Sequence, residues 1–114
     1  MEFPPNQGLD QEEVNEQVAE ALEENEVVLF MKGTELMPQC GYSRKALGLI
    51  GEHRDEYETV DVLESLDEFR QALSERSDWE TIPQTFVDGE FVGGSDILEE
   101  LEERDELAET LNAA

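Results

Sequence analysis

Cys40 is the only cysteine in this chain of 114 residues, and its surroundings predict a reactive thiol. It follows an apolar run and a loop, and a segment of helical character begins directly after it. The free N–H groups and the dipole at a helix N-terminus stabilise an anion, so a thiol there has a lowered pKa. Lys32, Arg44 and Lys45 place three of the seven basic side chains near it in sequence. The alternative is an inert cysteine that fills space in the core, and the local cations argue against it.

Position 43 is a serine, so the motif Cys40-Gly41-Tyr42-Ser43 lacks the second thiol of a C-x-x-C sequence. A protein with two thiols can resolve a mixed disulfide internally, whereas this chain needs an external thiol for any exchange reaction. An iron–sulfur cluster usually takes four thiolates, so a dimer would supply two and small-molecule thiols the rest. Because one cysteine cannot form an internal disulfide, we expect a cytoplasmic location.

The elements that must position Cys40 can be predicted from the spacing of apolar residues. Helical spacing at i, i+4, i+7 and i+8 marks the first helix, and an unbroken apolar run suits a strand buried on both faces. An Asp-Gly pair between β-rich segments indicates a hairpin. The expected elements, in order, are a helix from residue 10 or 11, a strand over 27–31, a loop over 32–39, a helix over 41–52, a strand over 57–62, a helix that includes 66–73, a hairpin turning at 88–89, and a helix from residue 95.

This order, α-β-α-β-α-β-β-α, predicts an α/β fold in which helices cover both faces of a four-stranded mixed sheet. The helix over 41–52 is expected to bury Tyr42 with its aliphatic residues. Residues 1–9 are interpreted as a flexible N-terminal arm, because they contain Pro4, Pro5 and Gly8, and 10–111 as one domain. His53 is interpreted as a surface residue and not as a metal ligand.

Charge is the extreme property of the composition, with 31 acidic against 7 basic side chains and a formal net charge of −24. Nucleic acid requires a basic surface, and an anionic membrane would repel this chain, so we expect neither as a partner. Disorder is disfavoured because the apolar segments are regular. The acidity instead indicates a halophilic protein, adapted to a cytoplasm in which dense ions screen the repulsion among carboxylates.

Four short motifs carry a resemblance to a known family. They are M-K-G-T at 31–34, P-Q-C-G-Y-S at 38–43, I-P-Q-T-F-V at 82–87 and G-G-S-D at 93–96. In this order, over roughly residues 10–105, they resemble the monothiol glutaredoxins of the C-G-F-S type. Tyr42 replaces the more common phenylalanine, and Glu80 replaces a proline that usually follows the tryptophan.

The resemblance implies a thioredoxin fold and binding of glutathione. Many members hold a [2Fe–2S] cluster between two protomers, ligated by one cysteine of each and by two glutathione thiolates. The implied state is therefore a cluster-bridged homodimer when loaded and a monomer when apo. The implied partners are iron–sulfur client or carrier proteins, and the implied role is iron–sulfur protein maturation and redox homeostasis. Cys40 would be both the catalytic thiol and the metal ligand.

The resemblance also implies where each part of glutathione binds. Lys32 and Arg70 would meet the glycyl carboxylate, although Arg70 has the alternative of being a surface residue that pairs with nearby glutamates. The backbone of Ile82, followed by a cis Pro83, would pair with the cysteinyl unit. A related thiol without the glycyl carboxylate, such as γ-glutamylcysteine, would depend less on Lys32.

The γ-glutamyl end would bind at the start of the last helix. The N–H groups of Gly94 and Ser95 would hold its carboxylate and Asp96 its amine, although Asp96 has the alternative of only capping the helix. Trp79 is interpreted as a packing residue of its loop. The complete expected ligand-binding set is Lys32, Cys40, Gly41, Tyr42, Arg70, Ile82, Pro83, Gly94, Ser95 and Asp96.

Two other functions compete with cluster carriage. One is a thiol-dependent oxidoreductase that reduces protein mixed disulfides through Cys40. The other is an adaptor that binds partners through its acidic helices while Cys40 is idle.

Overall fold

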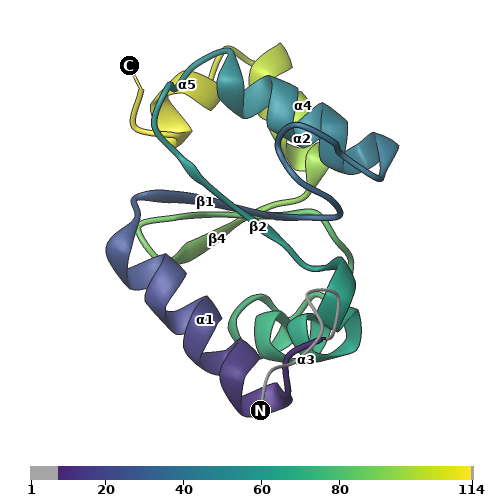
Figure 1. The fold of residues 1–114 in the computed structure, drawn as a ribbon. Coiled ribbons are helices and arrows are strands. Elements are labelled where there is room, and N and C mark those ends of the chain that lie inside the picture. Colours follow the sequence, from purple (N-terminus) through teal and green to yellow (C-terminus); the bar gives the residue numbers. More distant parts are fainter. Residues whose placement is uncertain (1–7, 114) are drawn as a thin grey trace.

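The computed structural model describes residues 8–113, so residues 1–7, most of the predicted arm, lie outside the described part of the chain. A four-stranded sheet with the order β2-β1-β3-β4 crosses the middle of the molecule (Figure 1). Strand β1 is parallel to β2 and antiparallel to β3, so the predicted mixed sheet is confirmed. The strands are β1 (Val27–Met31), β2 (Glu58–Asp61), β3 (Gln84–Val87) and β4 (Glu90–Gly93).

Helices cover both faces of this sheet (Figure 1). On one face α1 (Gln11–Glu24) packs beside α3 (Leu66–Ser77). On the other α2 (Gly41–Gly51) packs beside α4 (Ser95–Glu103), and α4 packs beside α5 (Leu107–Thr110). This is the thioredoxin fold, as expected. The short 3₁₀ turn at Leu63–Ser65 and the helix α5 were not predicted. Within residues 8–113, no helix is both long enough and apolar enough to cross a membrane.

Strand β1 is the centre of the core. All five of its side chains are buried, because β2 and β3 flank it and helices cover both its faces. Val28 and Phe30 pack in the core beneath α1 and α3, and Val27, Leu29 and Met31 pack in the core beneath α2 and α4. Since β1 is fixed on all sides, its carboxyl end is a rigid base for the loop that leads to Cys40.

Local interactions mark the predicted start of the first helix and the predicted hairpin turn. Asp10 accepts a hydrogen bond from the N–H of Glu13 at 2.8 Å, and the Glu13 carboxylate accepts the N–H of Asp10, which forms a capping box for α1. Asp88 and Gly89 both have positive φ in the two-residue turn between β3 and β4, as a type I′ hairpin requires. Leu9, which falls in the predicted arm, donates its N–H to Ser65 Oγ at 2.6 Å.

The prediction that Tyr42 is buried is wrong, because its side chain is 64% exposed. The buried face of α2 is formed by Ser43, Ala46 and Ile50, which recur at i, i+3 and i+7. Tyr42 precedes this series by one residue and therefore points away from the sheet, toward the surface beside Cys40.

Candidate functional site

Cys40 is the N-cap residue of α2 and has an extended backbone, with φ −151° and ψ 134°. Its carbonyl accepts the N–H of Arg44 at 2.9 Å, which is the first hydrogen bond of the helix. The N–H groups of the first turn therefore have no acceptor within the helix and lie around the half-buried thiol. The predicted position at a helix start is confirmed.

The surroundings of Cys40 favour its thiolate. Partial burial acts to raise the pKa of the thiol, but the backbone N–H groups of Ser43 and Tyr42, the Ser43 hydroxyl and the positive charge of Lys32 outweigh it. The pKa of Cys40 therefore lies below its usual range. Since the thiolate is both the nucleophile and the metal ligand, this environment prepares the sulfur for either role.

Ser43 occupies the position of the second cysteine in a C-x-x-C motif, and it has a structural contact of its own. It is fully buried, and its Oγ accepts the backbone N–H of Lys32 at 3.0 Å. This bond joins the first turn of α2 to the end of β1. The serine thus holds Cys40 and Lys32 in register.

The loop over 32–39 is closed by its own backbone. Gln39 donates its N–H to the Lys32 carbonyl at 2.9 Å, and Thr34 and Met37 exchange hydrogen bonds at 3.2 and 3.1 Å. Gly33 has φ +94°, and a Cβ there would lie 2.5 Å from the Met37 carbonyl oxygen, so only glycine fits. The closed loop sets the distance from β1 to Cys40 and leaves Leu36 92% exposed at its tip.

A cavity of about 600 Å³ opens beside Tyr42, between the start of α4 and the loop that precedes β3. Six of the predicted ligand-binding residues line it. The lining consists of Tyr42, Trp79, Thr81, Ile82, Pro83, Gly94, Ser95, Asp96 and Ile97.

Two backbone features shape this cavity. The Ile82–Pro83 peptide bond is cis, as predicted. Gly94 lies against it, since a Cβ on Gly94 would be 3.2 Å from the Pro83 carbonyl oxygen. Gly94 is the N-cap residue of α4, and no side chain within residues 8–113 caps that helix, so its first N–H groups are available to an anionic ligand. The exposed Asp96 side chain therefore does not serve as the cap of α4.

The predicted cations are not all free for a ligand. Lys45 forms an ion pair with Glu99 at 2.8 Å, and this hydrogen-bonded contact raises its pKa. Arg70 does not line the cavity, and its nearest acid is Asp67, 3.9 Å away. Lys32 acts on Cys40 through its charge. Of these three cations, Lys32 is the one whose charge lowers the pKa of the Cys40 thiol.

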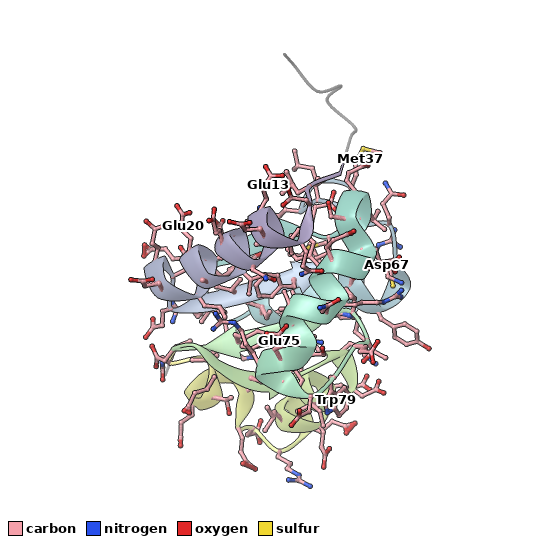
Figure 2. The ribbon with its side chains drawn as sticks, turned by 90° about the horizontal axis from the view of Figure 1, so that it is seen from below. Glu13, Glu20, Met37, Asp67, Glu75 and Trp79 are labelled. Atoms are coloured by element: carbon pink, nitrogen blue, oxygen red, sulfur yellow. The ribbon has the colours of Figure 1, made fainter. Side chains whose placement is uncertain are left out.

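Three cavity residues were absent from the predicted ligand-binding set: Trp79, Thr81 and Ile97. Trp79 does pack within its surroundings, with its ring centroid 5.7 Å from that of Phe91. It is nevertheless 47% exposed and projects beyond the end of α3 (Figure 2). The sequence did contain a signal for this role. Trp79 lies only three residues before Ile82, which was itself predicted to contact the ligand, so a neighbouring side chain of this size could also reach the cavity.

A second group of potential ligand side chains lies elsewhere. Glu52, His53 and Glu102 place one ligand atom each within 4.8 Å of one another, where α2 ends beside α4. His53 Nε2 is 2.7 Å from Glu102 Oε1. His53 is half-buried by this contact, which links the two helices.

Known proteins resemble this chain over most of its length. The sequence model of the glutaredoxin family matches residues 27–92. An uncharacterised monothiol glutaredoxin of Porphyra purpurea is 46% identical over 105 residues, covering 90% of this chain and 97% of that protein. The mitochondrial monothiol glutaredoxin-5 of Saccharomyces cerevisiae is 40% identical over 105 residues, covering 90% of this chain and 69% of that protein. The solution structure of reduced poplar apo GrxS14 has a TM-score of 0.75 and 38% identity, covering 87% of this chain and 90% of that one.

Proposed function

The chain belongs to the glutaredoxin family, among its monothiol members, and on this premise we propose that it binds glutathione or a related thiol and carries a [2Fe–2S] cluster to client proteins. The observation that carries the proposal is the lone Cys40, whose lowered pKa favours a thiolate. Cys40 does not itself line the cavity, but Tyr42, two residues further along the chain, does. We further propose a cytoplasmic location and iron–sulfur proteins as partners.

The cavity suits a thiol with the groups of glutathione. A volume of about 600 Å³ is within the range of pockets for small molecules. The uncapped N–H groups of α4 would take the γ-glutamyl carboxylate, and Asp96 its amine. The backbone of Ile82 would pair with the cysteinyl unit, and Lys32 would meet the glycyl carboxylate, with Arg70 at the same end. Bound in this way, the ligand would bring its sulfur toward Cys40.

The number of thiolates determines the assembly we propose. One protomer offers one cysteine, and a [2Fe–2S] cluster takes four thiolates as a rule. Two protomers and two bound small-molecule thiols supply that number. The cluster is the cargo of this assembly, and the chain contributes to it a half-buried thiolate at a helix N-terminus. The homodimer would separate when the cluster is handed over.

The test is an ultraviolet–visible spectrum and a native mass of protein purified without oxygen or reconstituted with iron, sulfide and glutathione. We expect a coloured dimer, and we expect Cys40→Ser to be a colourless monomer. Lys32→Gln should weaken cluster retention, whereas Arg104→Gln removes the same charge from a residue paired with Glu100 and should not. A cluster that persists in Cys40→Ser would overturn the proposal.

The lowered thiol pKa equally suits a second function, reduction of mixed disulfides between proteins and glutathione. The Cys40 thiolate would attack the glutathione sulfur, releasing the protein thiolate, which takes up a proton. A second glutathione thiolate would then attack the Cys40 mixed disulfide, releasing glutathione disulfide and restoring Cys40. Fast turnover of a glutathionylated protein by cluster-free protein favours this function, and slow turnover favours cluster carriage.

A further inference from the structure

We propose that Gln84 is a positioning residue of the cavity, because its buried amide holds the loop that carries Trp79 along the cavity wall. The inference rests on the proposed function only in treating this cavity as the thiol-binding site. Gln84 is the first residue of β3 and is fully buried. It does not line the cavity itself and acts through the residues before it.

The contacts of Gln84 reach back along the chain. Its Nε2 donates to the carbonyl oxygen of Trp79 at 2.9 Å and to that of Thr81 at 3.1 Å. Both acceptors belong to the segment between α3 and β3, and both residues line the cavity. Since Ile82 and Pro83 follow directly, the same amide also holds the segment that presents the Ile82 backbone.

The carbonyl oxygen of the same amide indicates that Gln84 does more than fill space in the core. Its Oε1 is buried and has no hydrogen-bond partner among the described residues. A buried oxygen without a partner is unfavourable, so an apolar side chain would pack there at lower cost. What glutamine adds is two N–H donors, and both donate to the loop. The amide orientation follows from the two carbonyl acceptors, which only the NH₂ group can satisfy.

Trp79 is held from three sides, and Gln84 provides one of them. Its backbone N–H donates to Ser77 Oγ at 3.1 Å, and its carbonyl accepts from Gln84 at 2.9 Å and from Ser77 Oγ at 3.2 Å. Its ring packs on Phe91, which in turn packs on Phe86 with centroids 5.5 Å apart. Trp79 lines the cavity, is 47% exposed and lies at the end of α3 (Figure 2). A loosened carbonyl would let this wall move before a ligand binds.

Gln84→Met tests the inference because methionine keeps the length of the side chain and removes both donors. Thr85→Val is a matched control. Thr85 is the next residue in β3 and is also fully buried, and its hydroxyl has no hydrogen-bond partner among the described residues, so it makes no hydrogen bond to the loop. Ser77→Ala is a second variant, which removes the two contacts of the Ser77 hydroxyl with the N–H and the carbonyl of Trp79 at a less buried position.

Three measurements separate positioning from general damage. Trp79 is the only tryptophan in the chain, so quenching of its fluorescence by acrylamide reports on the loop without any ligand. Titration with glutathione gives the affinity of the cavity. The pH dependence of Cys40 alkylation gives the pKa of the thiol, which depends on groups of α2 and on Lys32 directly after β1, and not on Gln84.

We expect Gln84→Met to increase acrylamide quenching and to weaken glutathione binding by about fivefold to tenfold, as the loss of one or two hydrogen bonds implies. Ser77→Ala should change both in the same direction by less, and the pKa of Cys40 should stay unchanged in both variants. Thr85→Val should change none of the three. Gln84→Met that matches Thr85→Val in quenching and affinity would overturn the inference. Absence of glutathione binding in the unsubstituted protein would count against the proposed function instead, since the quenching comparison needs no ligand.

Discussion

The Ser43 hydroxyl connects two properties that are usually considered separately, the reactivity of Cys40 and the stability of the loop. It helps to lower the pKa of the thiol, and its oxygen accepts the N–H of Lys32 at 3.0 Å. Replacing it therefore changes a site and a tertiary contact together. In a dithiol relative the second sulfur would have to serve in place of this hydroxyl, and sulfur is the weaker acceptor.

We predict that Ser43→Ala raises the pKa of Cys40 and destabilises the fold by about 1 to 2 kcal/mol, because a partly buried N–H loses its acceptor. The rate of iodoacetamide reaction as a function of pH would show its inflection at higher pH. Ser74→Ala is the control, since the Ser74 hydroxyl donates to Gln71 within α3. An inflection unchanged from that of the original protein would contradict the role given to the Ser43 hydroxyl.

At the same scale, the sequence predicted the identity of the reactive residue better than the shape of its pocket. Cys40 was recognisable because its context depends on local order, a strand followed by a loop and a helix. Trp79 was assigned to packing only, although it is 47% exposed and lines the cavity. Tyr42 was expected to be buried and is not. Whether an aromatic ring faces the core or a cavity depends on segments distant in sequence, which periodicity does not report.

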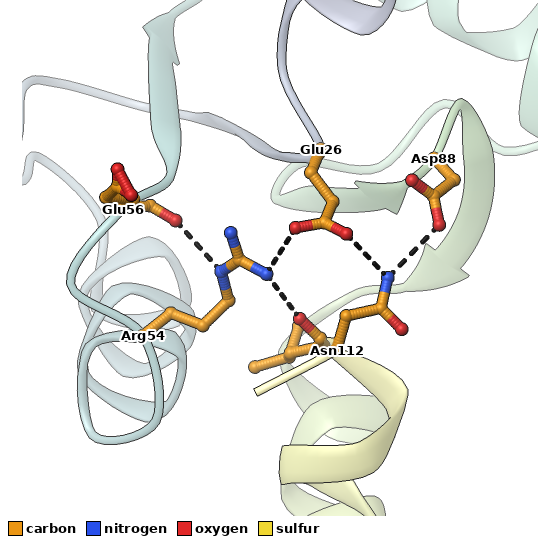
Figure 3. Close-up of polar contacts among 6 residues, drawn as sticks. Glu26, Arg54, Glu56, Asp88 and Asn112 are labelled. Carbon is orange, nitrogen blue, oxygen red and sulfur yellow. Dashed lines mark hydrogen bonds and ion pairs between the residues drawn. The ribbon is translucent and has the colours of Figure 1, made fainter. Parts of the chain in front are cut away.

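Among the elements, one arginine joins parts of the chain that are far apart in sequence (Figure 3). Arg54, which follows α2, donates through Nη1 to Glu26 at 2.7 Å and to the Leu111 carbonyl at 2.8 Å. Its Nε donates to the Glu56 carbonyl at 2.9 Å. Asn112 donates to the other oxygen of Glu26 and to Asp88 (Figure 3). This network ties the end of α5 to the start of β1 and to the β3–β4 turn.

We predict that Arg54→Met destabilises the fold by about 2 kcal/mol, because two backbone carbonyls lose their donor at a site where the arginine side chain is only 15% exposed. Arg104→Met is the matched control. It also removes one positive charge, but the side chain of Arg104, the C-cap residue of α4, has Glu100 as its only polar partner among the described residues and is 61% exposed, so its loss should be near zero. Denaturant unfolding at molar KCl measures both, and equal losses would contradict the specific role of the network.

Glu26 gives this network a pH dependence of known sign. Hydrogen bonds from Arg54 and Asn112 hold the pKa of this carboxyl below its usual range. A carboxylate of this kind stabilises the fold above its unfolded pKa of about 4.3, and the effect is lost as the pH falls through the lower, folded value. We therefore expect the original protein to be more stable than Glu26→Gln at pH 7 and the difference to shrink below about pH 4. Unfolding midpoints across this range measure it, and a difference that persists in acid would contradict the assignment.

The elements themselves were largely predictable, and the exceptions have a common cause. Strand β1 was predicted residue for residue, because burial on both faces leaves an unbroken apolar run. Helix α5 spans only Leu107–Thr110, which is too short for a periodic pattern, and Leu107 and Leu111 are buried by packing on α2 and α4. The strand order β2-β1-β3-β4 was likewise not predicted. It depends on which strands pair with each other, and strands that follow one another in sequence need not be neighbours in the sheet.

For the molecule as a whole, the high negative charge is the property that we expect to control stability and association. Acidic side chains project from α1 and α3, with Glu13, Glu20, Asp67 and Glu75 among them (Figure 2). The formal net charge is −24, and three of the seven basic residues (Lys45, Arg54 and Arg104) are paired with glutamates. Screening by salt is therefore expected to control how far this surface repels itself.

We predict that the melting temperature rises by at least about 5 °C from dilute buffer to 1 M KCl, equivalent to about 1 kcal/mol in a domain of this size. The Debye length falls from about 30 Å at 0.01 M to about 3 Å at 1 M, which removes most repulsion between exposed carboxylates. Replacing exposed glutamates of α1 with glutamine (Glu16, Glu20 and Glu23) should reduce the dependence. A melting temperature that stays flat across this range would contradict a salt-adapted surface.

The same charge sets a condition on the proposed cluster-bridged dimer. Two protomers, each with a formal charge of −24, must approach until their Cys40 thiolates share one cluster. Exposed charges interact across a gap only within about one Debye length, so strong salt should favour the loaded dimer and dilute buffer should dissociate it. We predict that the dimer fraction of reconstituted protein, measured by light scattering well below the melting temperature, rises steeply with KCl while circular dichroism stays constant. Cys40→Ser at the same concentrations should remain monomeric and would show any association caused by salt alone. A loaded dimer that is equally stable in dilute buffer would mean that the contact surface around Cys40 is shielded from the acidic remainder of the molecule.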